Sequence, residues 1–342
     1  MTSIPKHFLC AVAAVGALIA PPAAADQLEQ AFDRAFGGVQ PRSAPIAAPT
    51  PSALPSHGLP AGFETRLANL ANASMGRIGV AAVDLSSGHG ISVMGDQPFP
   101  LASTGKVAIV ATFLEGVDQG RFRLTDRFPM MMPVPSRKFS SATAPVRPGM
   151  MLSADELINL ALTRSDNHAT DALLAAMGGP QAVTRWLHHA GVSGIRIDRD
   201  IATLVRDDGK INPATTIDLR DSTTPQAMAT LLAGLYQGQW LSPSSREVLL
   251  SAMRRCQTGV RRMKALLPEQ AMIGHKTGTL ANTSSDVGII RNADGHTIAV
   301  AIYVTGQGSK PGREQRIATI ARATYEGYQA DPATSLSMGG SH

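Results

Sequence analysis

Three short strings decide the fold of this 342-residue chain: Ser103-Thr104-Gly105-Lys106, Ser165-Asp166-Asn167 and Lys276-Thr277-Gly278, in that order and at wide spacing. A serine nucleophile needs a nearby base and groups that hold the oxyanion it creates. Ser103 and Lys106 are three residues apart, so on a helix they share one face and can touch. The first string therefore predicts a serine nucleophile and a lysine base at the start of a helix.

A lysine can act as a base only if it loses its proton near neutral pH. Desolvation and a second cation nearby both lower a lysine pKa. We expect Lys276 to be that second cation and Ser165 to relay a proton towards the leaving group. A serine such as Ser103 could by itself be a helix N-cap, and Ser3-Ile4-Pro5-Lys6 also matches S-x-x-K. The prediction therefore depends on the joint occurrence of the three strings.

That joint occurrence is a known catalytic set, and the sequence resembles the class A β-lactamases and the penicillin-binding proteins, class A more closely. The resemblance extends from about Phe63 to about Gln329. It includes three further stretches, which are Arg220-Asp221-Ser222-Thr223-Thr224-Pro225, the run from Thr258-Gly259 through Arg262 to Leu266-Leu267-Pro268, and His275-Lys276-Thr277-Gly278-Thr279.

The periodicity of the chain indicates the same fold. Residues that alternate in polarity predict strands at Ile78–Leu85, Gly90–Gly95, Met272–Thr279, Ser284–Arg291 and His296–Thr305. Helical spacing predicts helices at Phe63–Asn72, Val107–Leu114, Ala154–Arg164, Ala169–Met177, Pro180–Ala190, Pro225–Tyr236, Ser244–Arg254 and Arg313–Tyr328. We therefore expect a mixed α/β (α+β) fold with one five-stranded antiparallel sheet flanked by helices and an all-α lobe. The resemblance implies that this fold is of the β-lactamase/transpeptidase type.

The chain also divides by composition. Residues 1–25 have a basic start, a short apolar run and Ala23-Ala24-Ala25, which predicts a cleaved signal peptide. Residues 26–61 are rich in Pro and Ala and predict a linker. The hydrolase-like domain is expected at 62–330, with an α/β lobe at 62–107 and 248–330, an all-α lobe at 108–247 and a flexible tail at 331–342. We expect an exported protein, periplasmic or secreted, with no membrane span after cleavage.

Cleavage would remove Cys10 and leave Cys256 as the only cysteine, so no intramolecular disulfide is expected. The net charge of +5 comes from interspersed residues, which argues against a nucleic-acid surface. We expect no cofactor and no metal ion. We expect the protein to be a monomer. Its expected partner is a small-molecule substrate, either a β-lactam or a D-alanyl peptide.

The resemblance implies roles for the remaining site residues. Ser103 would attack the carbonyl of the substrate, and the backbone N–H groups of Ser103 and Thr279 would hold the oxyanion. Asn167 would hydrogen-bond the substrate's side-chain amide. The substrate carboxylate would be bound along the third string and by a cation, for which the candidates are Thr277, Gly278, Thr279 and Arg262. Arg261 and Lys264 are the alternatives to Arg262, and each could be no more than a solvated charge.

The deacylating base departs from the class A pattern. Class A enzymes place a glutamate in the Ω loop, yet no glutamate lies between Arg196 and Asp221. Counting forward from Gly178-Gly179-Pro180 puts the glutamate position at Ile201, whereas counting backward from Arg220-Asp221 puts it at Asp208, with Asn212 four residues later. Isoleucine cannot accept a proton. The open candidates for the base are Asp208, which is also compatible with a plain turn, then Asp200, Lys106, or none.

Three function classes follow. The first is an exported serine β-lactamase with an atypical Ω loop. The second is a cell-wall D,D-peptidase, in which a missing glutamate and slow penicillin turnover are expected. The third is a penicillin sensor that is only acylated, which has less need of the full set Ser103, Lys106, Ser165 and Lys276. An esterase or amidase on the same scaffold is a further possibility, and the fold alone does not separate these readings.

Overall fold

The computed structural model describes residues 62–73, 75–293 and 295–329. The predicted signal peptide (1–25), linker (26–61) and tail (331–342) lie outside the described residues. Within those described ranges, every helix is too short or too polar to cross a bilayer.

A five-stranded antiparallel sheet runs in the order β2-β1-β10-β9-β8. Its strands are β1 Gly76–Asp84, β2 Gly90–Val93, β8 Met272–Leu280, β9 Thr283–Arg291 and β10 Thr297–Gly306. The first two strands and the last three come from opposite ends of the domain, and β1 pairs with β10 along its whole length. The predicted sheet is therefore confirmed, and β8, which carries Lys276, lies at one edge of it.

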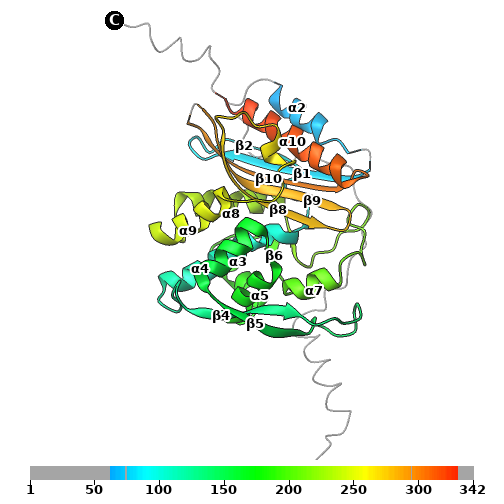
Figure 1. Ribbon diagram of the computed structural model, residues 1–342. Helices are drawn as coiled ribbons and strands as arrows, with labels where there is room; N and C mark the ends of the chain where they lie inside the picture. Colours follow the sequence, from blue (N-terminus) through cyan, green and yellow to red (C-terminus); the bar gives the residue numbers. More distant parts are fainter. Residues whose placement is uncertain (1–61, 74, 294, 330–342) are drawn as a thin grey trace, which may run out of the picture. The chain divides into compact units, whose positions relative to one another are not determined.

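Both faces of this sheet are covered, which explains why every residue of β10 is buried. Ile298 and Val300 pack into a core with α2 Phe63–Leu70 and α10 Lys310–Gly327, and Figure 1 shows both helices on one side of the sheet. Ala299 and Tyr303, which alternate with them, pack into a second core with the helices of the middle segment. Alternate side chains of one strand thus serve two cores.

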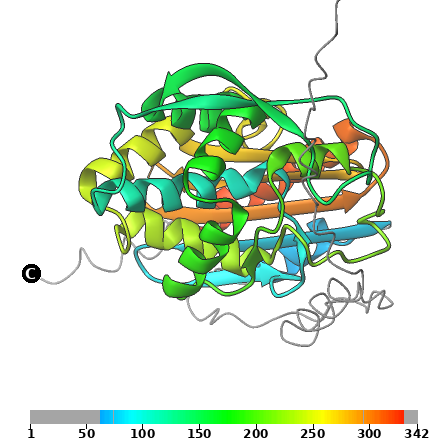
Figure 2. The same ribbon diagram turned by 90° about the horizontal axis from the view of Figure 1, so that it is seen from below.

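The middle of the chain is mostly helical. Its helices are α3 Lys106–Asp118, α4 Ala154–Asn159, α5 Asn167–Ala176, α6 Pro180–His189, α7 Ile201–Arg206, α8 Pro225–Gln237 and α9 Pro243–Arg254. Figure 2 shows these helices in front of the sheet strands. The predicted mixed α/β fold class is confirmed, since a five-stranded antiparallel sheet is flanked by helices.

The middle segment also contains strands that the sequence did not reveal, so the prediction that residues 108–247 form an all-α lobe was wrong. β4 Arg127–Pro133 pairs with β5 Val146–Ser153, and a small sheet joins β3 Phe99–Pro100, β7 Ser222–Thr223 and β6 Ile195–Arg196. Most residues of β4 and β5 are half-buried or exposed, so no alternation of polarity marks them. Prolines within both strands further weaken the strand signal.

Two helical predictions also changed in detail. The helix expected over Ala154–Arg164 divides into α4 and a π-helical turn at Leu160–Arg164. α7 had no periodic signal because it is only six residues long. Both elements lie beside predicted site residues, since the π turn ends at Ser165 and α7 begins at Ile201.

Candidate active site

Ser103 lies in a 3₁₀ turn, Ala102–Gly105, that precedes α3 instead of inside the α-helix itself. Thr104 fixes this turn, since its hydroxyl donates to the Leu101 carbonyl (2.6 Å) and pairs with the buried Tyr303 hydroxyl of β10 (3.1 Å). Ala102 has a φ of 47°, a left-handed conformation that costs about 1–3 kcal/mol in a non-glycine residue. Ser103 caps neither this turn nor α3, so the alternative that Ser103 is only a helix N-cap is wrong.

Lys106 is fully buried at the first position of α3. Its ammonium group donates to the Ser165 carbonyl (2.6 Å) and Asn167 Oδ1 (2.7 Å), and lies 3.4 Å from Ser165 Oγ. Burial lowers the pKa of Lys106 well below its usual value, and the positive charge of Lys276 lowers it further. These contacts hold the amine between the first and second strings.

Lys276 reaches the same point from β8. It is fully buried, and its Nζ donates to Ser165 Oγ (2.9 Å) and to the Thr277 carbonyl (2.8 Å). Burial lowers its pKa to about 8, helped by Arg262 and opposed by Cys256 and Asp286. The Ser165 hydroxyl therefore lies between two buried lysine side chains, a position suited to passing protons.

Local backbone geometry turns the second string towards these lysines. The π turn at Leu160–Arg164 ends at Ser165, whose φ of 59° is left-handed. The chain then reverses into α5, where the Asp166 carboxylate caps the helix by accepting from the Ala169 N–H (2.8 Å). Ser165 and Asn167 thus both face Lys106, on either side of the Asp166 side chain, which caps α5 and whose negative charge acts to raise the pKa of Lys106.

Gly278 allows β8 to approach the Ser103 turn. A Cβ atom at this position would lie 2.4 Å from Ser285 Oγ and 3.0 Å from the Ala102 Cβ. Any side chain there would push the strand away from the turn. Gly278 is thus a residue of close approach, which agrees with its place in the K-T-G string.

The other face of β8 carries hydroxyl groups and a buried arginine. The hydroxyls of Thr258 and Thr277 are 2.6 Å apart, and Arg262 donates to the Thr279 hydroxyl at 2.6 Å. The Arg262 guanidinium also forms an ion pair with Glu314 of α10 (3.3 Å). Arg262 is buried and Arg261 is exposed, so the structure separates the two candidates for the cation.

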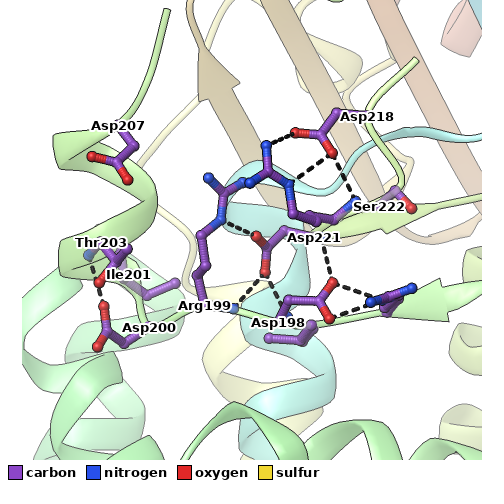
Figure 3. Close-up of polar contacts among 12 residues, drawn as sticks. Asp198, Arg199, Asp200, Ile201, Thr203, Asp207, Asp218, Asp221 and Ser222 are labelled. Carbon is purple, nitrogen blue, oxygen red and sulfur yellow. Dashed lines mark hydrogen bonds and ion pairs between the residues drawn. The ribbon is translucent and has the colours of Figure 1, made fainter. Parts of the chain in front are cut away.

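We call residues 198–221 the Ω segment, and Figure 3 shows the polar contacts that join its two ends. An ion pair between Arg199 and Asp221 (2.6 Å) joins its two ends. The backbone N–H groups of Asp198 and Arg199 also donate to the Asp221 carboxylate (2.8 and 3.0 Å). These contacts between the two ends of the Ω segment fix where helix α7, which lies within the segment, begins.

α7 begins at Ile201, whose side chain is buried. Asp200 caps this helix by accepting from the Thr203 N–H (2.7 Å), so its carboxylate already has a structural partner. The N–H groups of Ile201 and Ala202 donate to the two oxygens of Asp171 (2.7 and 2.8 Å). Asp171 was not identified from the sequence, although it lies one helical turn after Asn167 on α5 and so shares its face.

Asp171 is a buried carboxylate that interacts with the charge of Lys106. Burial raises its pKa to about 7, with a small contribution from Asp200, whereas the two N–H donors and the charge of Lys106 act in the opposite direction. It is therefore a titratable group that accepts a hydrogen bond from the backbone N–H of Ile201, the position that the forward count assigns to the missing glutamate.

The structure places Asp208 and Asn212 elsewhere. The Asp208 carboxylate accepts from the Ala281 N–H (2.9 and 3.1 Å), and Asn212 Oδ1 accepts from the side-chain amide of Asn282 (2.9 Å). Both partners are in the turn between β8 and β9. Neither side chain shares a hydrogen bond with the lysine cluster in the described part of the chain, so the structure does not bring them together with it.

The fold and this cluster define a mixed α/β protein with a serine turn and two buried lysines at one edge of its sheet. Residues 62–328 match the sequence profile of the Beta-lactamase enzyme family. The β-lactamase OXY-2 of Klebsiella oxytoca is 30% identical over 294 residues, which cover 82% of this chain and 96% of that protein. The β-lactamase CTX-M-25 of Escherichia coli is 31% identical over 270 residues, covering 78% and 89% of the two chains.

Solved structures agree with these relatives. An ancestral (GNCA) class A β-lactamase superposes with a TM-score of 0.68 at 35% identity, covering 78% of this chain and 100% of that one. A β-lactamase from Xanthomonas campestris gives a TM-score of 0.66 at 28% identity, covering 78% and 97%. The chain belongs to the β-lactamase enzyme family.

Proposed function

We propose that the chain is an exported serine β-lactamase that hydrolyses β-lactam antibiotics through an acyl-enzyme on Ser103. The observation that carries this proposal is the Ser165 hydroxyl held between Lys106 and Lys276 at 3.4 and 2.9 Å. Two buried amines with lowered pKa values, joined by a hydroxyl, provide both a base and a path for the proton. The hydrolase domain would span residues 62–330.

Acylation would start when neutral Lys106 accepts the proton of the Ser103 hydroxyl as its oxygen attacks the β-lactam carbonyl carbon. The N–H groups of Ser103 and Thr279 would bind the resulting oxyanion. Collapse breaks the ring C–N bond, and the leaving nitrogen takes a proton from Ser165. Ser165 would in turn be reprotonated by Lys106, which completes the proton transfer.

Substrate binding would use the two faces of β8. The Thr277 and Thr279 hydroxyls and the charge of Arg262 suit a carboxylate, since hydrogen bonds to ionised groups contribute about 1.5–3 kcal/mol each. Asn167 would bind the substrate's amide, and its contact with Lys106 holds it ready. Gly278 would keep the strand close enough for these groups to meet at Ser103.

Release of the acyl group is where this chain would differ from glutamate-containing relatives. We place Ile201 at the glutamate position, because α7 begins there and its N–H groups contact α5. The isoleucine side chain provides no base, so the acyl-enzyme would persist longer unless another group activates water. Asp208 and Asn212 remain candidates by the backward count, and their contacts with the β8–β9 turn weigh against that role.

The same observation favours one alternative, a D,D-peptidase acting on D-alanyl cell-wall peptides. An apolar Ile201 in place of a base is compatible with slow penicillin release, while the acylating groups are those that either reaction needs. A D-alanyl peptide and a β-lactam both present a carbonyl to the serine and a carboxylate to β8. Turnover of the two substrates by the same protein separates these functions.

The test follows adduct mass and turnover with penicillin and a chromogenic cephalosporin. Wild type is expected to gain the mass of one penicillin and to hydrolyse the cephalosporin. Ser103→Ala should show neither, whereas Ser86→Ala, at an exposed serine of the β1–β2 turn, should match wild type. Adduct formation by Ser103→Ala at the wild-type rate would exclude Ser103 as the nucleophile. Hydrolysis of a D-alanyl dipeptide but not of the cephalosporin would select the peptidase.

A further inference from the structure

A second nucleophilic array lies next to β8 and takes no part in the proposed acylation. It consists of Cys256, which follows α9, His275 of β8 and Asp286 of β9. His275 Nδ1 lies 2.9 Å from Asp286 Oδ1 and 3.0 Å from Oδ2, and both side chains are buried. The imidazole also hydrogen-bonds the thiol of Cys256, which is only half-buried. A thiol, an imidazole and a carboxylate thus form one chain, the arrangement that activates a nucleophilic cysteine.

The charges in this array favour the thiolate. Burial opposes the protonation of His275, but the charge and hydrogen bond of Asp286, together with those of Cys256, outweigh it and raise the pKa of His275 to about 10. Burial would likewise raise the pKa of Cys256, but the hydrogen bond and positive charge of His275 lower it to about 7. An imidazolium beside a thiol is the environment in which reactive cysteines are found.

The surrounding charged groups leave this pairing intact. Lys276 on β8 adds positive charge, and Arg262 is bound to Glu314 of α10. Of the two arginines that end α9 and precede the cysteine, Arg254 forms an ion pair with Glu247 and Arg255 donates to the side chains of Ser251 and Asn159. Asp286 is thus the carboxylate that contacts His275 directly.

Cys256 is connected to the substrate-binding face as well. Its sulfur lies 3.3 Å from the Thr258 hydroxyl, which in turn lies 2.6 Å from the Thr277 hydroxyl. The β8–β9 register places Thr277 directly opposite Asp286, so the thiol array and the threonine share one face of the sheet. A group attached to the sulfur would therefore lie beside the K-T-G string.

We propose that Cys256 is a modification site for small-molecule disulfides, activated by His275 and Asp286. The thiolate sulfur attacks one sulfur of the disulfide and a new S–S bond forms. The old S–S bond breaks, and the departing thiolate carries its electron pair away. Cys256 is oxidised to a mixed disulfide, and one half of the reagent is reduced to a thiol.

The modification would act on the proposed hydrolase, and this second part rests on the proposed function. The Cys256 thiolate supports the positive charge of Lys276. A neutral mixed disulfide removes that support, so Lys276 would lose its proton at lower pH. It would also displace Thr258 from its contact with Thr277. The pH profile of kcat/KM should shift to lower pH and KM should rise.

The first measurement is the rate of reaction with 5,5′-dithiobis(2-nitrobenzoate) between pH 5 and 10. The rate should rise with a midpoint near pH 7, where an ordinary thiol, with a pKa of about 8.5, is only about 3% ionised. At pH 7 this gives about fifteen times more thiolate. His275→Asn should move the midpoint to pH 8 or above, and Cys256→Ser should not react.

A wild-type midpoint at pH 8.5 or above, or an intact native protein that does not react, would overturn the proposal even if His275→Asn fails to fold. The second measurement uses protein converted to its S-methyl disulfide with methyl methanethiosulfonate. A shifted kcat/KM profile, absent in treated Cys256→Ser and reversed by dithiothreitol, supports the coupling; an unchanged profile refutes it. If unmodified protein hydrolyses no β-lactam while labelling keeps its midpoint near pH 7, the proposed function fails and the thiol site stands.

Discussion

Replacing Arg262 by alanine should destabilise the protein and weaken substrate binding together. Its guanidinium donates to the carbonyls of Gly278 and Ser285 (2.8 Å each), to the Thr279 hydroxyl (2.6 Å) and to Glu314 (3.3 Å), and the residue is only 3% exposed. Alanine would leave a mostly buried carboxylate and two carbonyls without their donor. Removing one partner of a buried ion pair typically costs about 3–5 kcal/mol.

Such a loss lowers Tm by about 5–9 °C for a domain of this size. Thermal unfolding followed by circular dichroism measures it, with Arg261→Ala as the matched control. Arg261 is exposed and adjacent in sequence, so its removal should change stability by less than about 0.5 kcal/mol. The double variant Arg262→Ala/Glu314→Ala should be less destabilised than the sum of the single variants, because it leaves no unpaired charge.

The kinetic effect has the same origin. The Arg262 charge and the Thr279 hydroxyl that it orients would bind the substrate carboxylate in the ground state and the transition state alike. KM should therefore rise more than kcat falls, with kcat/KM lowered by about ten- to a hundred-fold. If the Arg262→Ala and Arg261→Ala proteins had the same Tm and the same KM, the assignment of Arg262 as the buried cation would be refuted.

Three further predictions concern proton transfer and the Ω segment. Lys106→Ala and Ser165→Ala should each slow acylation strongly, as measured by stopped-flow labelling. The double variant should be little slower than either single variant, because the two residues act as one unit. Additive losses of rate in the double variant would contradict this. Ile201→Glu should speed release of the acyl group in a time course of adduct mass, whereas Asp208→Asn should leave release unchanged; a trapped adduct in Asp208→Asn would instead identify that residue as the base. Asp171 has a folded pKa near 7, above its value in the unfolded chain, so its contribution to stability is present below about pH 4 and is lost as pH rises through 7. In Asp171→Asn, Tm should therefore depend less on pH between pH 4 and 8 than it does in wild type. An unchanged slope of Tm against pH would show that Asp171 is not the group that titrates.

Much of the fold could be predicted because it depends on local pattern. The alternation of Ile78–Leu85 and the apolar run after Ser103 predicted β1 and α3 within a few residues. The order of the three strings predicted the family, and the family fold includes the five-stranded sheet. The sequence did not predict β4 and β5, because a mostly half-exposed hairpin with prolines has neither helical nor strand periodicity.

The candidate site divides in the same way. The sequence by itself determined the chemical types, a serine, two lysines and a second serine at fixed places in their motifs, since these occur as contiguous strings. Only the tertiary structure decided that Ser165 lies between both lysines, that Asp208 turns towards Ala281, and that Cys256 meets His275. These contacts join residues 19 to 111 positions apart. No sequence period relates such residues, because their separation in space is set by how helices and strands pack, and the pKa values follow from that burial.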